Sequence, residues 1–123
     1  LWTLYEYETG QFKLPEDACG GMIYGGCNCG NCHITISSNG DIMACRRVTD
    51  SRVANIWEDR LADVWVCQME KYRDYDKFKK CSKCELKAWC RGCPAVANGT
   101  TGDFYGADPQ CWKTRNGITG EEL

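Results

Sequence analysis

Cysteine content constrains this chain more than any other feature of its sequence. Eleven of the 123 residues are cysteine, and a chain with about 9% cysteine is generally held together by cross-links or bound metal as well as by its apolar core. Four of the eleven lie in the stretch CSKCELKAWCRGC, residues 81–93. These thiols must serve as disulfides, as zinc ligands or as iron–sulfur ligands.

Disulfides are the least favoured of the three uses. An odd number of cysteines leaves at least one thiol over, and disulfides persist mainly in oxidising compartments. The first residues, LWTLYEYETG, have neither the basic start nor the apolar core of a secretion signal. No run approaches the roughly 20 apolar residues of a membrane span. We therefore expect a soluble, cytoplasmic protein, and the start at Leu1 indicates a fragment of a longer one.

Charge and length narrow the choice of partner and architecture. The formal net charge of −2 provides no general attraction to nucleic acid or to an anionic membrane, so neither is expected as a partner. A chain of this length suits one domain. We expect a single compact unit.

Local patterns predict a small α+β fold stabilised by metal or clusters. Residues 1–18, in which aromatic and polar positions alternate, favour an edge strand in a connecting segment. In HITISSNGDIMAC, residues 33–45, apolar and polar positions alternate on both sides of Asn39-Gly40, which predicts a β-hairpin ending at Cys45. The run from Asn55 to Phe78 has apolar residues near helical spacing and predicts an amphipathic helix with Asn55 as its N-cap.

Cysteine-rich loops complete this prediction. Residues 19–32 are rich in glycine and cysteine, which favours irregular backbone that approaches a bulky group closely. The stretch after Cys93 is again glycine-rich, and residues 113–123 form a polar tail.

The cysteine spacings predict metal binding without naming the metal. Two cysteines separated by two residues direct both sulfurs at one metal from a tight turn, and three pairs fit: Cys81/Cys84, Cys90/Cys93 and Cys29/Cys32. Only five residues separate Cys84 from Cys90, fewer than the roughly 12 to 20 usual between the knuckles of a four-cysteine zinc site. The remaining cysteines require a second site. This set of cysteines is sufficient to ligate either two iron–sulfur clusters or two zinc ions.

Cys27, Gly40 and Cys45 are followed by the predicted helix, by C-x2-C-x5-C-x2-C and by a late cysteine. This order of motifs resembles the SPASM domain, the auxiliary-cluster region of radical SAM enzymes that modify peptides and proteins. SSNGDIMAC is similar to the family's hairpin, NIWEDRLADVW to its helix start and DPQCW to its closing segment. The resemblance covers residues 19–112. It departs at Arg91-Gly92, where the family has three residues between cysteines.

This resemblance implies two [4Fe–4S] clusters. The implied ligands of the first cluster are Cys19, Cys27, Cys45 and Cys93, and those of the second are Cys81, Cys84, Cys90 and Cys111. Cys29 or Cys32 could replace Cys19. Cys67 lies in the predicted helix and is expected to be a buried apolar residue. Zinc or single iron ions could occupy the sites after an aerobic preparation.

The implied function is electron transfer, substrate positioning or both. A cluster with four thiolates exchanges electrons only, whereas an open iron in the first cluster would bind a substrate group directly. Nearby charges at Arg46, Arg47 and Arg91 would adjust the potentials. The chain lacks the C-x3-C-x2-C loop that binds S-adenosylmethionine, so we expect an accessory module, inactive alone, beside a radical SAM core in the same full-length chain. Its expected substrate is a peptide or protein. The alternative is a structural zinc-binding protein-interaction module.

Overall fold

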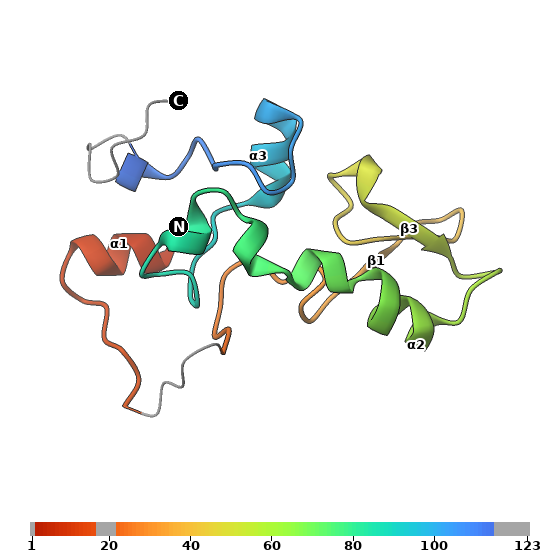
Figure 1. Cartoon of the computed structure of the whole chain (residues 1–123), viewed down its shortest axis with the longest axis horizontal. Helices are drawn as coiled ribbons and strands as arrows, with labels where there is room; N and C mark the ends of the chain where they lie inside the picture. The colour runs from red at the N-terminus through yellow and green to blue at the C-terminus, as the bar shows by residue number, and fades with distance from the viewer. Residues whose placement is uncertain (1, 17–21, 115–123) are drawn as a thin grey trace. The chain divides into compact units, whose positions relative to one another are not determined.

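The computed structural model describes residues 2–16 and 22–114 (Figure 1). The chain divides into two compact units instead of the single one that we predicted from its length. Unit 1 comprises Leu1–Cys27 and Phe78–Leu123, and unit 2 comprises Asn28–Lys77. Stretch 28–77 separates because its sheet and helix bury their own core, which includes Ile42 and Met69. Cys19 and residues 115–123 of the predicted tail lie outside the described residues.

The N-terminal segment forms helix α1, Trp2–Glu8, so the predicted edge strand is wrong. The indole nitrogen of Trp2 donates to the Glu6 carboxylate at 2.7 Å, a pairing four residues apart that suits a helix surface. Leu4 is the buried residue of the helix. The aromatic side chains that suggested a strand are exposed, among them Trp2 and Tyr5. Their alternation therefore did not mark a buried face.

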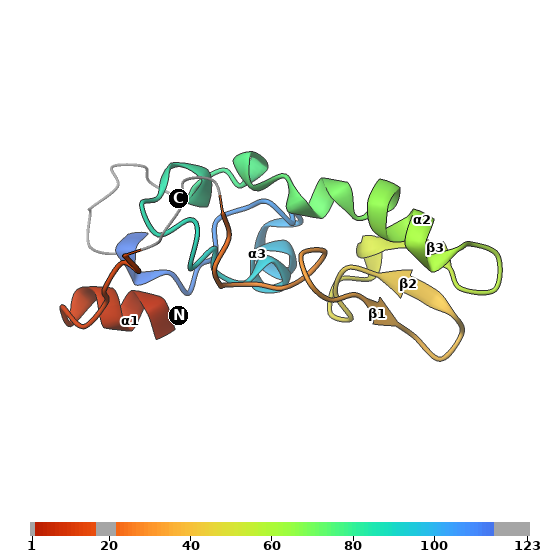
Figure 2. The same cartoon turned by 90° about the horizontal axis from the view of Figure 1, so that it is seen from below.

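The predicted hairpin is confirmed in unit 2. Strands β1, Thr35–Ile36, and β2, Asp41–Met43, pair antiparallel around the Asn39-Gly40 turn. A third strand that we did not predict, β3, Arg52–Asn55, pairs antiparallel with β2. Figure 2 shows the three strands side by side. The turn requires glycine, since Gly40 has a φ of 87° and an added Cβ would lie 2.5 Å from the Trp57 indole nitrogen.

The helical region of unit 2 begins later than predicted and is irregular. Helix α2 covers only Leu61–Asp63, and the chain continues as π turn η2, Val64–Gln68, and 3-10 turn η3, Glu70–Arg73. Asn55 is not a helix N-cap, because it ends β3 and its side-chain oxygen accepts from the Trp57 amide at 3.0 Å. Trp57, an apolar residue of the run that predicted the longer helix, is 82% exposed.

The π turn also explains why Cys67 is exposed, against our prediction of a buried residue. The Met69 amide donates to the Val64 carbonyl five residues earlier, at 3.1 Å. This wide turn brings Val64 and Met69 to the same inner side, where both are buried. In an ordinary α-helix the residue three positions after Val64 would stay close to that side. Here Cys67 falls on the outer side.

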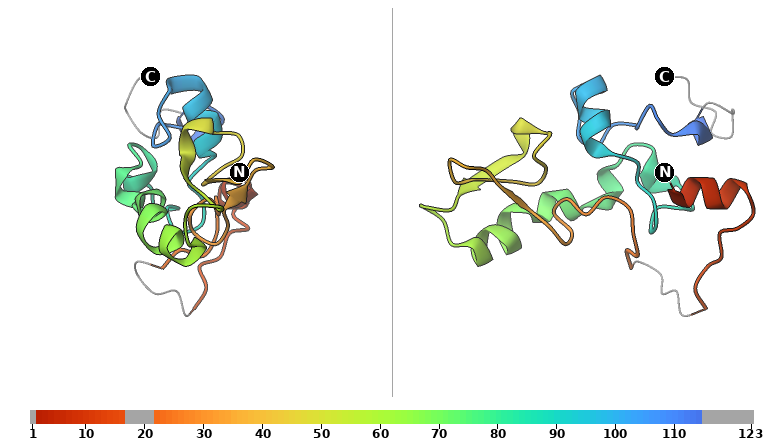
Figure 3. Two further views of the ribbon diagram at one scale, coloured as in Figure 1. Left: turned by 90° about the vertical axis from the view of Figure 1, so that its right-hand side faces the viewer. Right: turned by 180° about the vertical axis from the view of Figure 1, so that it is seen from behind.

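Unit 1 contains a second helix, α3, Pro94–Thr101, where we had described only a glycine-rich stretch (Figure 3). Pro94 occupies the first turn, where its fixed φ suits a helix and its missing N–H costs nothing. Gly102 ends the helix in the left-handed conformation, with its amide donating to Asn98 at 2.8 Å. Pro94 and Ala97 are the buried residues of the helix, and Ala97 is 1% exposed.

Short 3-10 turns connect these elements: η1 Thr49–Ser51, η4 Tyr75–Lys77, η5 Cys81–Lys83 and η6 Trp112–Thr114. The three-stranded antiparallel sheet, the short helices and the cysteine-rich turns make a small α+β fold, as predicted. Within the described residues, no helix combines the length and apolar character needed to cross a membrane. The core of unit 1 includes Leu4, Phe78 and Leu86.

Candidate metal centre

Four cysteines of unit 1 line one small cavity of about 30 Å³. They are Cys81, Cys84, Cys90 and Cys111, the set predicted for the second cluster. Leu4 and Leu86 contribute apolar walls, so helix α1 helps to shield the thiols from water. This role of Leu4 was not predicted, because a residue 77 positions before Cys81 gives no local signal in the sequence.

The turns of the four-cysteine block bring these thiols together. Cys81 opens η5, and the Cys84 amide donates to the Cys81 carbonyl at 3.1 Å. A second tight turn follows, in which the Cys90 amide donates to the Leu86 carbonyl at 2.8 Å. Cys111 arrives from the other end of the unit, with its amide donating to the Asp108 carbonyl at 3.0 Å.

The electrostatics of this cavity suit a bound cation. The pKa of the Cys81 thiol is raised to about 12, mainly by burial and to a smaller extent by the neighbouring Cys84, Cys111, Cys90 and Asp108. Without metal, Cys81 is therefore protonated at neutral pH. Iron or zinc would replace the proton and offset the repulsion between thiolates. The residues thus fit a thiolate-ligated metal group.

None of the ten described cysteines forms a disulfide. In the part of the chain that the structure describes, no three Cys, His, Asp or Glu side chains converge closely enough to hold a single metal ion. The four thiols line the cavity.

Asp108 connects two cysteines that belong to different predicted sets. The carboxylate is buried, with 4% exposure. Its Oδ2 accepts from the Cys93 amide at 2.7 Å, and its Oδ1 accepts from the Gln110 amide at 2.8 Å. Its carbonyl accepts from the Cys111 amide. Sequence analysis noted DPQCW without assigning Asp108 a role, although an Asp that bonds an amide two residues later is a known turn signal.

Replacing Asp108 by alanine should lower the free energy of unfolding by about 2–4 kcal/mol, because the Cys93 amide loses a charged, buried acceptor. Denaturant unfolding of the iron-loaded chain, followed by circular dichroism, measures this change. Asp108→Asn keeps one acceptor oxygen and should restore part of the loss.

The matched control is Asp74→Ala. Asp74 pairs with Lys77 at 3.2 Å on the surface of unit 2, and such a pair contributes at most about 1 kcal/mol. An Asp108→Ala variant as stable as this control would contradict the role of Asp108.

Arg91 fixes the backbone around Cys27. Its side chain is 2% exposed, and its guanidinium donates to the carbonyls of Lys87, Gly25 and Cys27 at 2.9, 2.8 and 3.0 Å. The rigid fork of arginine suits such a set of acceptors. Arg91 therefore holds Cys27 beside the four-cysteine block, in addition to the charge that we expected it to supply. Arg46 and Arg47 are exposed.

The set predicted for the first cluster is divided. Cys27 and Cys93 belong to unit 1, Cys45 belongs to unit 2, and Cys19 lies outside the described residues. The backbone at Cys45 is tied to the buried Ser51, whose hydroxyl accepts from the Cys45 amide and donates to the Val48 carbonyl. This set stays a prediction.

The two alternatives to Cys19 differ in exposure. Cys29 is buried and Cys32 is exposed. Both lie in a turn of unit 2, where the amides of Asn31, Cys32 and His33 converge on the Asn28 carbonyl.

Comparison with known proteins agrees with the chemistry of this cavity. The family model SPASM, described as an iron–sulfur cluster-binding domain, matches residues 27–94, more than half of the chain. An AdoMet-dependent heme synthase of Methanosarcina barkeri (strain Fusaro / DSM 804) is 34% identical over 89 residues. That match covers 70% of this chain and 25% of the relative, so the chain spans a quarter of the relative's length. No solved structure matches.

Proposed function

Because the chain belongs to the SPASM family of iron–sulfur cluster-binding domains, we propose that it is an electron-transfer module of a radical S-adenosylmethionine enzyme. The proposal is carried by the cavity that Cys81, Cys84, Cys90 and Cys111 line. Four thiolates satisfy a four-iron cluster completely, so it would exchange electrons without binding substrate. The radical SAM core would lie elsewhere in the same full-length protein, and the module would be inactive alone.

The proposed module spans residues 19–112 and holds two [4Fe–4S] clusters. Cys81, Cys84, Cys90 and Cys111 would hold the second cluster. The first would be held by Cys27, Cys45 and Cys93 together with Cys19, or with Cys29 or Cys32 in its place. Because the two sets interleave along the chain, both clusters would tie distant segments together. Bound clusters would then stabilise the fold as well as carry charge.

The substrate of the full-length enzyme is proposed to be a peptide or protein, as the resemblance implies. The relative named AdoMet-dependent heme synthase favours a second candidate, a tetrapyrrole. The loaded full-length enzyme, supplied with S-adenosylmethionine, distinguishes the two. A mass change in a peptide supports the first, and a shift in a porphyrin absorption spectrum supports the second.

Metal analysis tests the proposed module directly. The 123-residue chain is produced without oxygen and reconstituted with iron and sulfide, and iron, sulfide and zinc are determined beside a visible spectrum. We expect about eight iron and eight sulfide per chain with broad absorption near ~400 nm, as for two four-iron clusters.

The competing zinc-binding interaction module would give a different result. One or two zinc ions in a colourless chain that does not assemble iron would contradict the proposal. Colour alone separates the alternatives, because zinc thiolate sites do not absorb visible light and iron–sulfur clusters are brown.

A further inference from the structure

A second, larger pocket of unit 1, about 330 Å³ in volume, adjoins the same thiols. Cys81, Cys84 and Cys111 form part of its wall. The rest of the lining is charged and consists of Lys80, Lys83, Lys113 and Glu85. A molecule bound in this pocket would therefore lie beside the proposed ligands of the second cluster.

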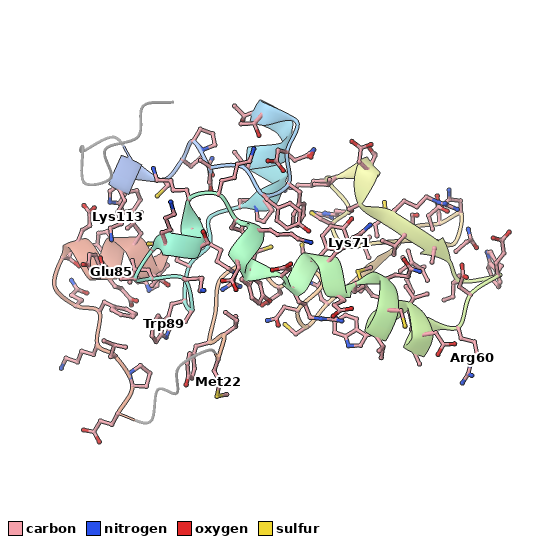
Figure 4. The ribbon with its side chains drawn as sticks, in the orientation of Figure 1. Met22, Arg60, Lys71, Glu85, Trp89 and Lys113 are labelled. Atoms are coloured by element: carbon pink, nitrogen blue, oxygen red, sulfur yellow. The ribbon has the colours of Figure 1, made fainter. Side chains whose placement is uncertain are left out.

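The lysine and glutamate side chains that line the pocket are together net positive, in a chain whose net charge is −2. Its three lysines face one carboxylate. Lys113 is 8% exposed, and its Nζ lies 2.6 Å from Glu85 Oε1. Both residues are labelled in Figure 4. The Tyr7 hydroxyl also donates to Glu85 at 2.6 Å, and Lys113 Nζ lies 4.6 Å from the Tyr7 ring centroid. Glu85 thus offsets the charge of Lys113.

Lys80 and Lys83 provide the charge that reaches the surface. Lys83 is exposed and Lys80 half-buried. Neither side chain is needed to bind iron, and both lie next to cysteines of the block. Long lysine side chains at the rim of a pocket attract a negatively charged surface and accelerate its encounter.

The neighbouring cluster site determines what kind of partner this pocket suits. A cluster with four thiolates exchanges electrons only, so a partner that approaches it is expected to be an electron carrier. Contacts between electron-transfer proteins are small and weak and depend on charge. A carrier with an acidic surface complements the lysines.

We propose that the lysine pocket, defined by Lys80, Lys83 and Lys113, is the docking site of a small acidic electron-carrier protein. This inference rests on the proposed function, since it requires a cluster behind the pocket. Lys80 and Lys83 attract the carrier's carboxylates, while the Lys113–Glu85 pair shapes the pocket floor.

The test compares the binding of an acidic ferredoxin to loaded wild-type chain and to loaded Lys83→Glu, by isothermal titration calorimetry at low salt. Reversing this charge should raise the dissociation constant about tenfold, as expected where charge steers association. At about 1 M salt, where the Debye length is about 3 Å, the difference should largely disappear.

Lys13→Glu is the matched control. Lys13 is an exposed residue outside the pocket lining, and its reversal changes the net charge by the same amount. Its dissociation constant should stay within about twofold of wild type. Equal weakening by both variants, or none by Lys83→Glu, would overturn the docking site.

Failure of the docking site and failure of the proposed function give separate signals. Iron content and the visible spectrum are recorded before each titration. A chain without iron contradicts the proposed function. A brown, fully loaded chain that binds ferredoxin equally well with and without the Lys83→Glu substitution contradicts only the docking site.

Discussion

Replacement of Cys90 by alanine should lower the iron content of the reconstituted chain from about eight to about four atoms, because one four-iron cluster loses a thiolate ligand. The three remaining thiols would leave one iron without a protein ligand, and we expect the whole cluster to be lost from this cavity. Iron and sulfide analysis, with an electron paramagnetic resonance spectrum of the reduced chain, measures the loss.

Cys67→Ala is the matched control for this result. Cys67 is exposed, belongs to unit 2 and lies in neither predicted set, so the variant should keep the full iron content. Cys93→Ala should also lose about four iron atoms but from the other cluster, so the surviving spectrum should differ from that of Cys90→Ala. Full iron content in Cys90→Ala would show that Cys90 is not a ligand.

The second large effect is expected at Gly92, which lies between Cys90 and Cys93. Gly92 has a φ of 64°, and an added Cβ would lie 2.7 Å from Asp108 Cβ and 2.8 Å from Asp108 Oδ2. Gly92→Ala should therefore disrupt the bond from the Cys93 amide to Asp108. We expect the free energy of unfolding to fall by about 3 kcal/mol, from left-handed strain and the displaced carboxylate together. Denaturant unfolding of the loaded chain measures it.

Gly99→Ala, in the same unit, is expected to have the opposite effect on stability. Gly99 lies in α3, and an added Cβ would meet no heavy atom within 4 Å. Alanine is the better helix former, so this variant should be more stable by about 0.5–1 kcal/mol. If Gly92→Ala behaved like Gly99→Ala, the Gly92–Asp108 contact would not matter to folding.

Local patterns predicted those features that depend on neighbours in the chain. Asn39-Gly40 between alternating residues predicted the hairpin, and its glycine does adopt a positive φ. Pro94 and Gly102 also carried a helix signal for α3 that we did not use. The edge strand at residues 1–18 was wrong, because the periodicity of exposed aromatic side chains does not report burial.

The sequence by itself determined the family and the hairpin, because motif spacing and turn chemistry act over a few residues. Only the tertiary structure decided that Leu4 covers the thiols, that Asp108 receives the Cys93 amide and that the π turn exposes Cys67. The contacts of Leu4 and Asp108 join residues far apart in sequence. The exposure of Cys67 depends on which residues of the π turn pack into the core of unit 2. Packing, and not spacing, sets these contacts.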